Sequence, residues 1–355
     1  MIMVGFLIAV IWGVGAAMKA PRQARWIMVG ILMVAVIAAQ LALPDGHPLR
    51  AATGGDARLW LLLLGLGAVV WGYAAVLRAV KARVRPAVAV PVSGSFSEDE
   101  LTRYARHIML REVGGRGQRA LKDARVLVVG AGGLGSPVLL YLAASGVGTI
   151  GVIDDDRVDA SNLQRQVIHR DGGRGLPKVQ SALQAVAELN PHVTVRPYDR
   201  RLTEDIAADL IADYDLVLDG CDNFDTRYLV NRTCVAAGVP LIAAALTQWE
   251  GQISLYDPAR GTPCYACVFP DRPAPGLVPT CAEAGVIGPL PGVMGSMMAV
   301  EAVKTLTGAG TGLGGRLLIY DALYAETRIV QVPAAPDCPV CGGRGLKVAA
   351  AQAKV

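Results

Sequence analysis

The chain has 355 residues, a length that allows two or three domains. Hydrophobic residues make up 53% of it, charged residues only 18%, and the mean hydropathy is +0.40, unlike an ordinary soluble domain. The net charge is +4, and much of the basic surplus flanks apolar segments, with no dense basic tract interleaved with aromatic residues. This distribution favours a membrane protein and argues against a nucleic-acid partner.

Three nearly uncharged apolar runs come first, at residues 1–18, 26–43 and 59–77. Each is close to the ~20 residues that span a bilayer as a helix. The first run lacks a basic n-region and is followed by two more, so we do not expect it to be a cleaved signal peptide. We therefore predict a membrane domain over residues 1–85 with three transmembrane helices.

The loops between these runs predict an orientation. The first loop carries Lys19, Arg22 and Arg25 without an acid, the second balances its arginines with aspartates, and four basic residues follow the third run at 78–85. Positive charge near a span marks its cytoplasmic side. We therefore expect a multi-pass protein of the inner (cytoplasmic) membrane, with everything after the third run in the cytoplasm.

A proline- and valine-rich linker, residues 86–96, precedes a capped helix that begins at Ser97. Arg103, Arg106 and His107 lie on neighbouring turns of this helix. From the residues alone, they form the solvated face of an amphipathic helix.

Residues 126–156 contain the pattern of a nucleotide-binding unit. An apolar run, 126–129, meets Gly130, Gly132, Gly133 and Gly135, and a second β-rich run ends in three aspartates, 154–156. Glycines let the chain turn sharply and let a phosphate approach the helix amides. Asp154 falls 19 residues after Gly135, where an acid can accept a ribose hydroxyl. This half of a doubly wound fold also suits an NAD-dependent oxidoreductase, so the kind of nucleotide stays open.

The rest of the chain alternates between β and α patterns. We predict a helix from Pro177 to about Leu189 and strands near 193–195, 214–219, 235–245, 252–256 and 316–321. The order predicts an α/β, doubly wound, Rossmann-like and mostly parallel sheet with an antiparallel extension, over residues 97–342. Residues 343–355 are a short basic tail.

Cations next to this nucleotide pattern favour ATP over NAD. Arg165 follows the acidic strand end, and Lys178 opens the next helix. Both bring positive charge to the phosphates, which stabilises a triphosphate under attack at its α-phosphorus. Asp222, after a later strand, reaches the same edge of the sheet, where it could hold Mg²⁺. The combination is typical of nucleotidyl transfer.

Four of the seven cysteines form two C-x-x-C pairs, Cys264/Cys267 and Cys338/Cys341. Two such pairs supply the four thiolates of a closed, tetrahedral, structural zinc site. The site would pin the C-terminal segment to the strand that ends near Tyr256. The alternative, a redox role, is disfavoured because the first pair does not open a helix after the first strand.

The ordered set of motifs RYARHI (103–108), GAGGLG (130–135), SNLQRQ (161–166), PK (177–178), DN (222–223), both cysteine pairs and TCAEAGV (280–286) resembles the ThiF/MoeB family. This family comprises adenylyltransferases that activate ubiquitin-like sulfur-carrier proteins, and it is related to ubiquitin-activating enzymes. The resemblance covers about residues 97–342. Two departures are His107, where the family commonly has glutamine, and the three apolar runs, which its usual soluble members lack.

The resemblance implies roles for individual residues. Asp154 binds ribose, Arg165 and Lys178 contact the triphosphate, and Arg106 reaches the partner subunit's site in a homodimer. The full set of predicted nucleotide-binding residues is Gly130, Gly132, Gly133, Gly135, Asp154, Asp156, Ser161, Asn162, Leu163, Gln164, Arg165, Lys178, Asp222 and Asn223. Cys281, in a proline- and glycine-rich segment, aligns with a conjugating cysteine of some members. Its thiol could attack an acyl-adenylate or carry sulfur.

The expected reaction is adenylation by Mg·ATP of the C-terminal glycine carboxylate of a sulfur carrier ending in Gly-Gly, with release of pyrophosphate. Sulfur from a separate donor would then serve molybdopterin or thiamine biosynthesis. The alternatives are an NAD-dependent oxidoreductase, a relative that adenylates a tRNA nucleoside, and an inactive membrane scaffold.

Overall fold

The computed structural model describes residues 2–18, 21–44, 46–54, 96–273 and 284–344, with single positions between 58 and 73. The chain forms two compact units, Met1–Val90 and Pro91–Val355. The predicted linker, apart from Phe96, and Cys281 lie outside the described residues, as does most of the third apolar run.

The N-terminal unit contains α1 (Ile2–Ala17), α2 (Arg22–Ala42) and α3 (Pro48–Thr53). Its buried polar contact is made by Gln40, whose side-chain amide donates to Thr53 Oγ1 at 2.7 Å and to the Arg50 carbonyl at 3.1 Å. Trp60 Nε1 donates to the Thr53 carbonyl at 3.0 Å. These bonds give partners to the Arg50 and Thr53 carbonyls at the end of α3, and the bonds from Gln40 join α3 to α2.

Of the three predicted membrane spans, one is found at full length. Residues Gln23–Ala42 of α2 form the one helix, among those described, that is long and apolar enough to cross a bilayer. The first run forms only the 16-residue α1, about 24 Å long, which is short for a hydrocarbon core of about 30 Å. The prediction of three spans is therefore corrected to one candidate helix. The third run cannot be counted because it falls largely outside the described residues.

The C-terminal unit is built on one eight-stranded sheet of order β3-β2-β1-β4-β5-β6-β7-β8. Its strands are β1 (Arg125–Val129), β2 (Thr149–Ile153), β3 (Thr194–Tyr198), β4 (Leu216–Asp219), β5 (Leu241–Thr247), β6 (Glu250–Tyr256), β7 (Arg316–Asp321) and β8 (Glu326–Gln331). The first five are parallel, and β6 to β8 are antiparallel. The predicted doubly wound sheet with an antiparallel extension is confirmed.

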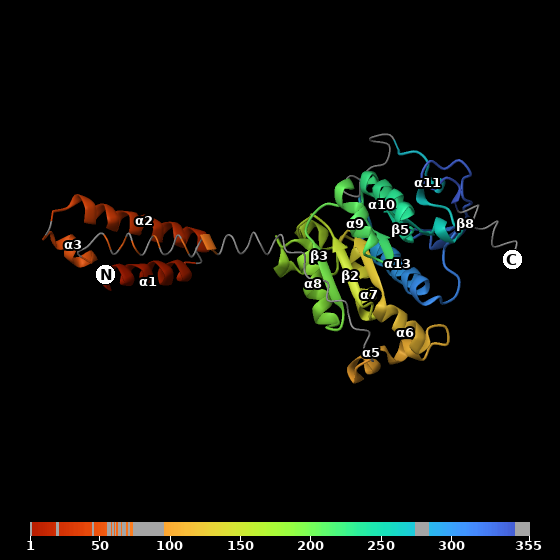
Figure 1. Cartoon of the computed structure of the whole chain (residues 1–355), viewed down its shortest axis with the longest axis horizontal. Coiled ribbons are helices and arrows are strands. Elements are labelled where there is room, and N and C mark those ends of the chain that lie inside the picture. Colours follow the sequence, from red (N-terminus) through yellow and green to blue (C-terminus); the bar gives the residue numbers. More distant parts are fainter. Residues whose placement is uncertain are drawn as a thin grey trace. The chain divides into compact units, whose positions relative to one another are not determined.

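Helices cover both faces of this sheet (Figure 1). They are α5 (Glu98–Ile108), α6 (Gly114–Asp123), α7 (Gly135–Ala144), α8 (Lys178–Leu189), α9 (Glu204–Ala212), α10 (Phe224–Ala237), α11 (Tyr265–Val268) and α13 (Pro289–Thr307). Side chains alternate along β1: Val126 and Val128 pack towards α7, α8 and α13, whereas Leu127 and Val129 pack towards α9 and α10. The two hydrophobic cores therefore lie on opposite faces of the sheet.

The strand order reverses between β1 and β4, which creates a crevice at their carboxyl ends. The register aligns these ends, because Val129 pairs with both Ile153 of β2 and Asp219 of β4. The loops that follow β1, β2 and β4 therefore start at one level.

One predicted strand began too early. Residues 235–237 are the last turn of α10, which Gly238 ends in the left-handed conformation, and β5 starts only at Leu241. The end of α10 and the start of β5 are both buried and therefore both apolar, so the apolar run did not reveal where the helix ends.

Candidate nucleotide-binding site

The loop after β1 needs glycine at two positions. Gly130 has φ +93°, and a Cβ on Gly135 would lie 2.0 Å from the Gly130 carbonyl oxygen. Within the described residues, the amides of Gly132, Gly133, Leu134 and Gly135 donate no hydrogen bond. Several unpaired amides at a helix N-terminus form a receptor for phosphate oxygens.

Asp154 follows β2 and lies directly against this loop. Its carboxylate accepts from the amides of Ala131 at 2.7 Å and Asp156 at 2.8 Å. Burial raises the pKa of Asp154 above its ordinary value, and Lys178 and the two amides counteract the shift. Two bonds leave lone pairs on the carboxylate for a ribose hydroxyl.

Arg165 reaches the glycine loop from the short segment after β2. Its guanidinium donates to Asn162 Oδ1 at 2.9 Å and to the Ser161 carbonyl at 3.3 Å. Its Cγ lies 3.6 Å from the position that a Cβ would take on Gly133. Leu163 and Gln164 belong to the same turn, so this predicted group is gathered beside the loop.

Lys178 opens α8 and is almost wholly buried, with 4% of its side chain exposed. Its ammonium lies 2.7 Å from the exposed carboxylate of Asp156, and its positive charge lowers the pKa of Asp154 against the effect of burial. A second cation is therefore held at the same crevice. The carboxylates of residues 154–156 also come within 4.8 Å of one another, and hard oxygen ligands of this kind suit Mg²⁺.

The loop after β4 closes the crevice. The Gly220 carbonyl would lie 3.2 Å from a Cβ on Gly130, and Asp222 is exposed two residues further on. Asn223, whose role in cofactor binding stays a prediction, caps α10: its Oδ1 accepts from the Thr226 amide at 2.9 Å.

Arg106 does not join this group of residues. Its helix α5 contacts the C-terminal end of α8, where Arg103 donates to the Leu189 carbonyl at 3.0 Å. Lys178 is at the opposite end of α8, about 18 Å away along a 12-residue helix. Arg106 is exposed, and the described residues contain no ion pair with it.

The four cysteines of the two pairs converge as predicted. The Sγ separations are 3.7 Å for Cys264/Cys267 and 3.5 Å for both Cys264/Cys338 and Cys267/Cys341. All four sulfurs lie within 4.8 Å of one another. Zn–S bonds of about 2.3 Å imply sulfur separations of about 3.8 Å in a tetrahedron, so the cluster fits zinc.

The sequence interpretation missed three buried residues around the crevice. His169 contacts the glycine loop, and Asp219 and Arg227 form an ion pair beneath it at 3.6 Å. In the sequence, His169 precedes Arg170 and Asp171, and Arg227 follows Asp225 and Thr226, so each resembles part of an ordinary polar segment. Such a segment does not identify a partner.

The comparisons with known proteins agree with this geometry. The ThiF family model matches residues 104–340. The sulfur carrier protein adenylyltransferase of Thermus thermophilus is 50% identical over 251 residues, 70% of this chain and 93% of that protein. The SAMP-activating enzyme E1 of Haloferax volcanii is 48% identical over 252 residues, 71% of this chain and 93% of that protein.

Among solved structures, E. coli MccB with MccA-N7isoASN has a TM-score of 0.60 at 24% identity, covering 68% of this chain and 74% of that chain. This likeness concerns the fold alone. A glycine loop whose amides have no partner among the described residues, an acid after β2 and two crevice cations define a nucleotide-binding enzyme of the doubly wound class. The chain belongs to the ThiF family.

Proposed function

We propose that this chain uses ATP to adenylate the C-terminal glycine carboxylate of a ubiquitin-like sulfur carrier. The observation that carries the proposal is the placement of Arg165 beside the glycine loop and of buried Lys178 at the carboxylates that follow β2. Hydride transfer from NAD has no need for converging cations, whereas attack on a triphosphate does. The names and coverage of the two relatives support the same activity.

The chemistry follows from charge. A carboxylate oxygen of the carrier attacks the α-phosphorus, the bond to the β-phosphate oxygen breaks, and pyrophosphate leaves with the electron pair. The nucleophile is already ionised, so the site needs no general base. Arg165, Lys178 and the loop amides neutralise the growing negative charge and position the phosphates.

Metal ions complete the proposal. Mg²⁺ would be held by Asp222, which is exposed in the loop after β4, and would screen the phosphates. Zn²⁺ would occupy the four-cysteine site and stabilise the C-terminal segment. The product acyl-adenylate would enter sulfur transfer for molybdopterin or thiamine biosynthesis.

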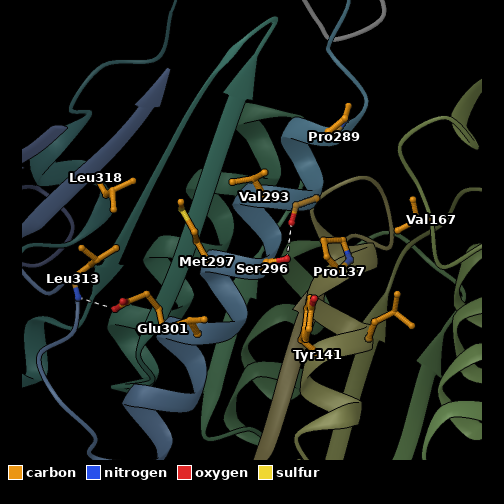
Figure 2. A pocket seen from close by; sticks show the side chains of 13 residues that line it. Pro137, Tyr141, Val167, Pro289, Val293, Ser296, Met297, Glu301, Leu313 and Leu318 are labelled. Atoms are coloured by element: carbon orange, nitrogen blue, oxygen red, sulfur yellow. Dashed lines mark hydrogen bonds between the residues drawn. The ribbon is translucent and has the colours of Figure 1, made fainter. Parts of the chain in front are cut away.

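A homodimer is part of the proposal. Arg106 is exposed on α5, the helix whose Arg103 contacts the end of α8 farther from the crevice, which leaves Arg106 available to a partner subunit. An apolar groove of about 860 Å³ between α7 and α13 offers a face for a second copy (Figure 2). Tyr141 and Val300 on this groove are 55% and 57% exposed. Apolar surface of this kind is typical of an interface.

The experiment that tests the proposal is ATP–pyrophosphate exchange. Exchange should require a carrier ending in Gly-Gly, and removal of its last glycine should abolish it. Arg165→Ala should lower the exchange rate about 100-fold, because a charge that stabilises the transition state is lost. Arg165→Lys, which keeps the charge, should retain more activity than the alanine variant. Tight binding of NAD without binding of ATP would overturn the proposal.

A further inference from the structure

His169 joins the glycine loop to α8. The imidazole is buried, with 4% of the residue exposed. Its Nε2 lies 2.9 Å from the Ala131 carbonyl oxygen, and its Nδ1 lies 3.0 Å from Ser181 Oγ. Ser181 is in the first turn of α8, three residues after Lys178. The ring therefore connects two elements that both contribute to the nucleotide site.

The two contacts determine the tautomer. A carbonyl oxygen only accepts, so Nε2 carries the proton and donates to Ala131. Nδ1 of the neutral ring then accepts from the Ser181 hydroxyl. Burial, helped by the charges of Lys178 and Arg170, lowers the pKa of His169 below its ordinary value of 6.5 and keeps the ring neutral near pH 7.

The Ala131 backbone is thus held at both of its polar groups. Its amide donates to Asp154 at 2.7 Å, and its carbonyl accepts from His169. In a trans peptide the C=O and the following N–H point in opposite directions. Because His169 fixes the Ala131 carbonyl on the buried side, the Gly132 amide points away from that side. It is one of the amides without a partner among the described residues.

We propose that His169 is a positioning residue that holds the Ala131–Gly132 peptide in the orientation in which Gly132 donates to a phosphate of ATP. The proposal rests on the function proposed above. His169 itself does not touch the nucleotide: it acts through the backbone, and Ser181 fixes the ring. A preorganised Gly132 amide increases affinity only for a ligand whose phosphate lies within hydrogen-bonding distance of it.

A matched pair of variants tests the proposal in the full-length protein. Gln places its amide nitrogen near the position of Nε2, so His169→Gln keeps the donor to Ala131. Asn places its amide nitrogen near the position of Nδ1, so His169→Asn loses that donor. Kd values for ATP and for adenosine, measured by titration calorimetry, distinguish a loss of phosphate binding from a general loss of nucleotide affinity.

We expect His169→Asn to raise the Kd for ATP about tenfold, or about 1.4 kcal/mol, while the Kd for adenosine stays within about twofold of the wild-type value. His169→Gln should restore most of the ATP affinity. Equal losses for ATP and adenosine, equal losses in both variants, or an unchanged ATP Kd in folded His169→Asn would overturn the proposal.

Two further outcomes are decisive. If His169→Asn does not fold, Ser181→Ala takes its place, because it removes the hydroxyl that fixes the ring. An unchanged ratio of the ATP and adenosine Kd values in that variant would then overturn the proposal. A wild-type protein that does not bind ATP would overturn the proposed function, and this inference with it.

Discussion

Arg227 and Asp219 form a buried ion pair under the crevice, with 6% and 0% of their side chains exposed. Arg227 also donates to the carbonyls of Cys221 at 2.7 Å and Ala244 at 3.0 Å. Its guanidinium lies 5.7 Å from the Tyr265 ring centroid. One side chain therefore joins the loop that carries Asp222 to the segment that carries the first cysteine pair.

Arg227→Met should destabilise the protein by about 3–5 kcal/mol, because it leaves a buried carboxylate without its cation. The free energy of urea unfolding measures this loss. Arg232→Met is the matched control. Arg232 is on the same helix as Arg227 and forms a surface ion pair with Glu204 of α9, so its replacement should lower the unfolding free energy by less than about 1 kcal/mol. The double variant Asp219→Asn/Arg227→Met should recover part of the loss. Equal effects of the two single arginine variants would contradict this account.

His169 predicts a pH dependence of stability. Burial lowers its pKa in the folded protein below 6.5, the value in an unfolded chain. The unfolded chain therefore takes up a proton first, and stability should fall as the pH drops below 6.5 towards the folded pKa. The slope has an upper limit of about 1.4 kcal/mol per pH unit. Above pH 6.5 this contribution is constant.

The measurement is the urea unfolding free energy of the wild type and His169→Gln between pH 7.5 and 5.5. Other titrating groups are common to both proteins, so the difference isolates His169. The variant should show a shallower decline on the acidic side. Parallel curves would show that His169 takes up its proton at an ordinary pH in the folded protein.

Residues whose function depends on local backbone geometry could be predicted from the sequence. Gly130, Gly135 and Asp154 fall within one strand–turn–helix–strand unit, so their relation follows from spacing. Arg227 and His169 could not be predicted in this way, because no spacing motif links them to their partners, Asp219 and Ala131. For Asn223, the motif predicts nucleotide binding, and the structure adds a local role as the cap of α10.

At the scale of elements, the four-cysteine cluster joins two distant parts of the chain. Cys264 and Cys267 flank the start of α11, and Cys338 and Cys341 lie in the turns after β8. Val235 of α10 packs against the buried cysteines, and Arg344 donates to its carbonyl at 3.1 Å. Loss of the metal should therefore free the C-terminal segment first.

Cys341→Ser should reduce bound zinc from about one ion per chain, as measured by elemental analysis, and should make residues after β8 sensitive to limited proteolysis. Chelation of the wild type should have the same effect. Cys234→Ala is the control, because Cys234 is buried in α10 outside the cluster. Full zinc content in Cys341→Ser would contradict the four-cysteine assignment.

Helix α13 shows why some helices cannot be predicted from local sequence propensity alone. Its sequence contains Pro291, Gly292 and Gly295, which disfavour a helix interior, and the sequence interpretation found no element there. A Cβ on Gly295 would lie 2.4 Å from the Leu134 carbonyl oxygen. Gly295 lowers the helix propensity of this segment but lets α13 approach the nucleotide loop. Tertiary packing therefore stabilises a helix that the local sequence does not favour.

At the scale of the whole molecule, the two units differ in how well the sequence anticipated them. The order of strands in the C-terminal unit follows from alternation of β and α patterns, and the crevice follows from that order. Apolar composition in the N-terminal unit indicates membrane segments without determining helix length. Residues 1–18 illustrate this, since the helix that they form ends at Ala17.

The remaining prediction is that Gln23–Ala42 anchors the protein in a membrane with the adenylating unit in the cytoplasm. The full chain should resist extraction at alkaline pH. Val34, which is 69% exposed on this helix, is a position for a test. Val34→Arg should shift protein to the soluble fraction, because an arginine at the middle of a span costs about 2.5–3.5 kcal/mol.

External protease added to spheroplasts should leave the unit after Pro91 intact, because four basic residues concentrate at 78–85, between the candidate helix and that unit. Disruption of the membrane should expose that unit to the protease. Val34→Ala is the control for extraction, since it keeps the helix apolar. Degradation in intact spheroplasts would reverse the proposed orientation. It would also separate the enzyme from cytoplasmic ATP, which is incompatible with the proposed reaction.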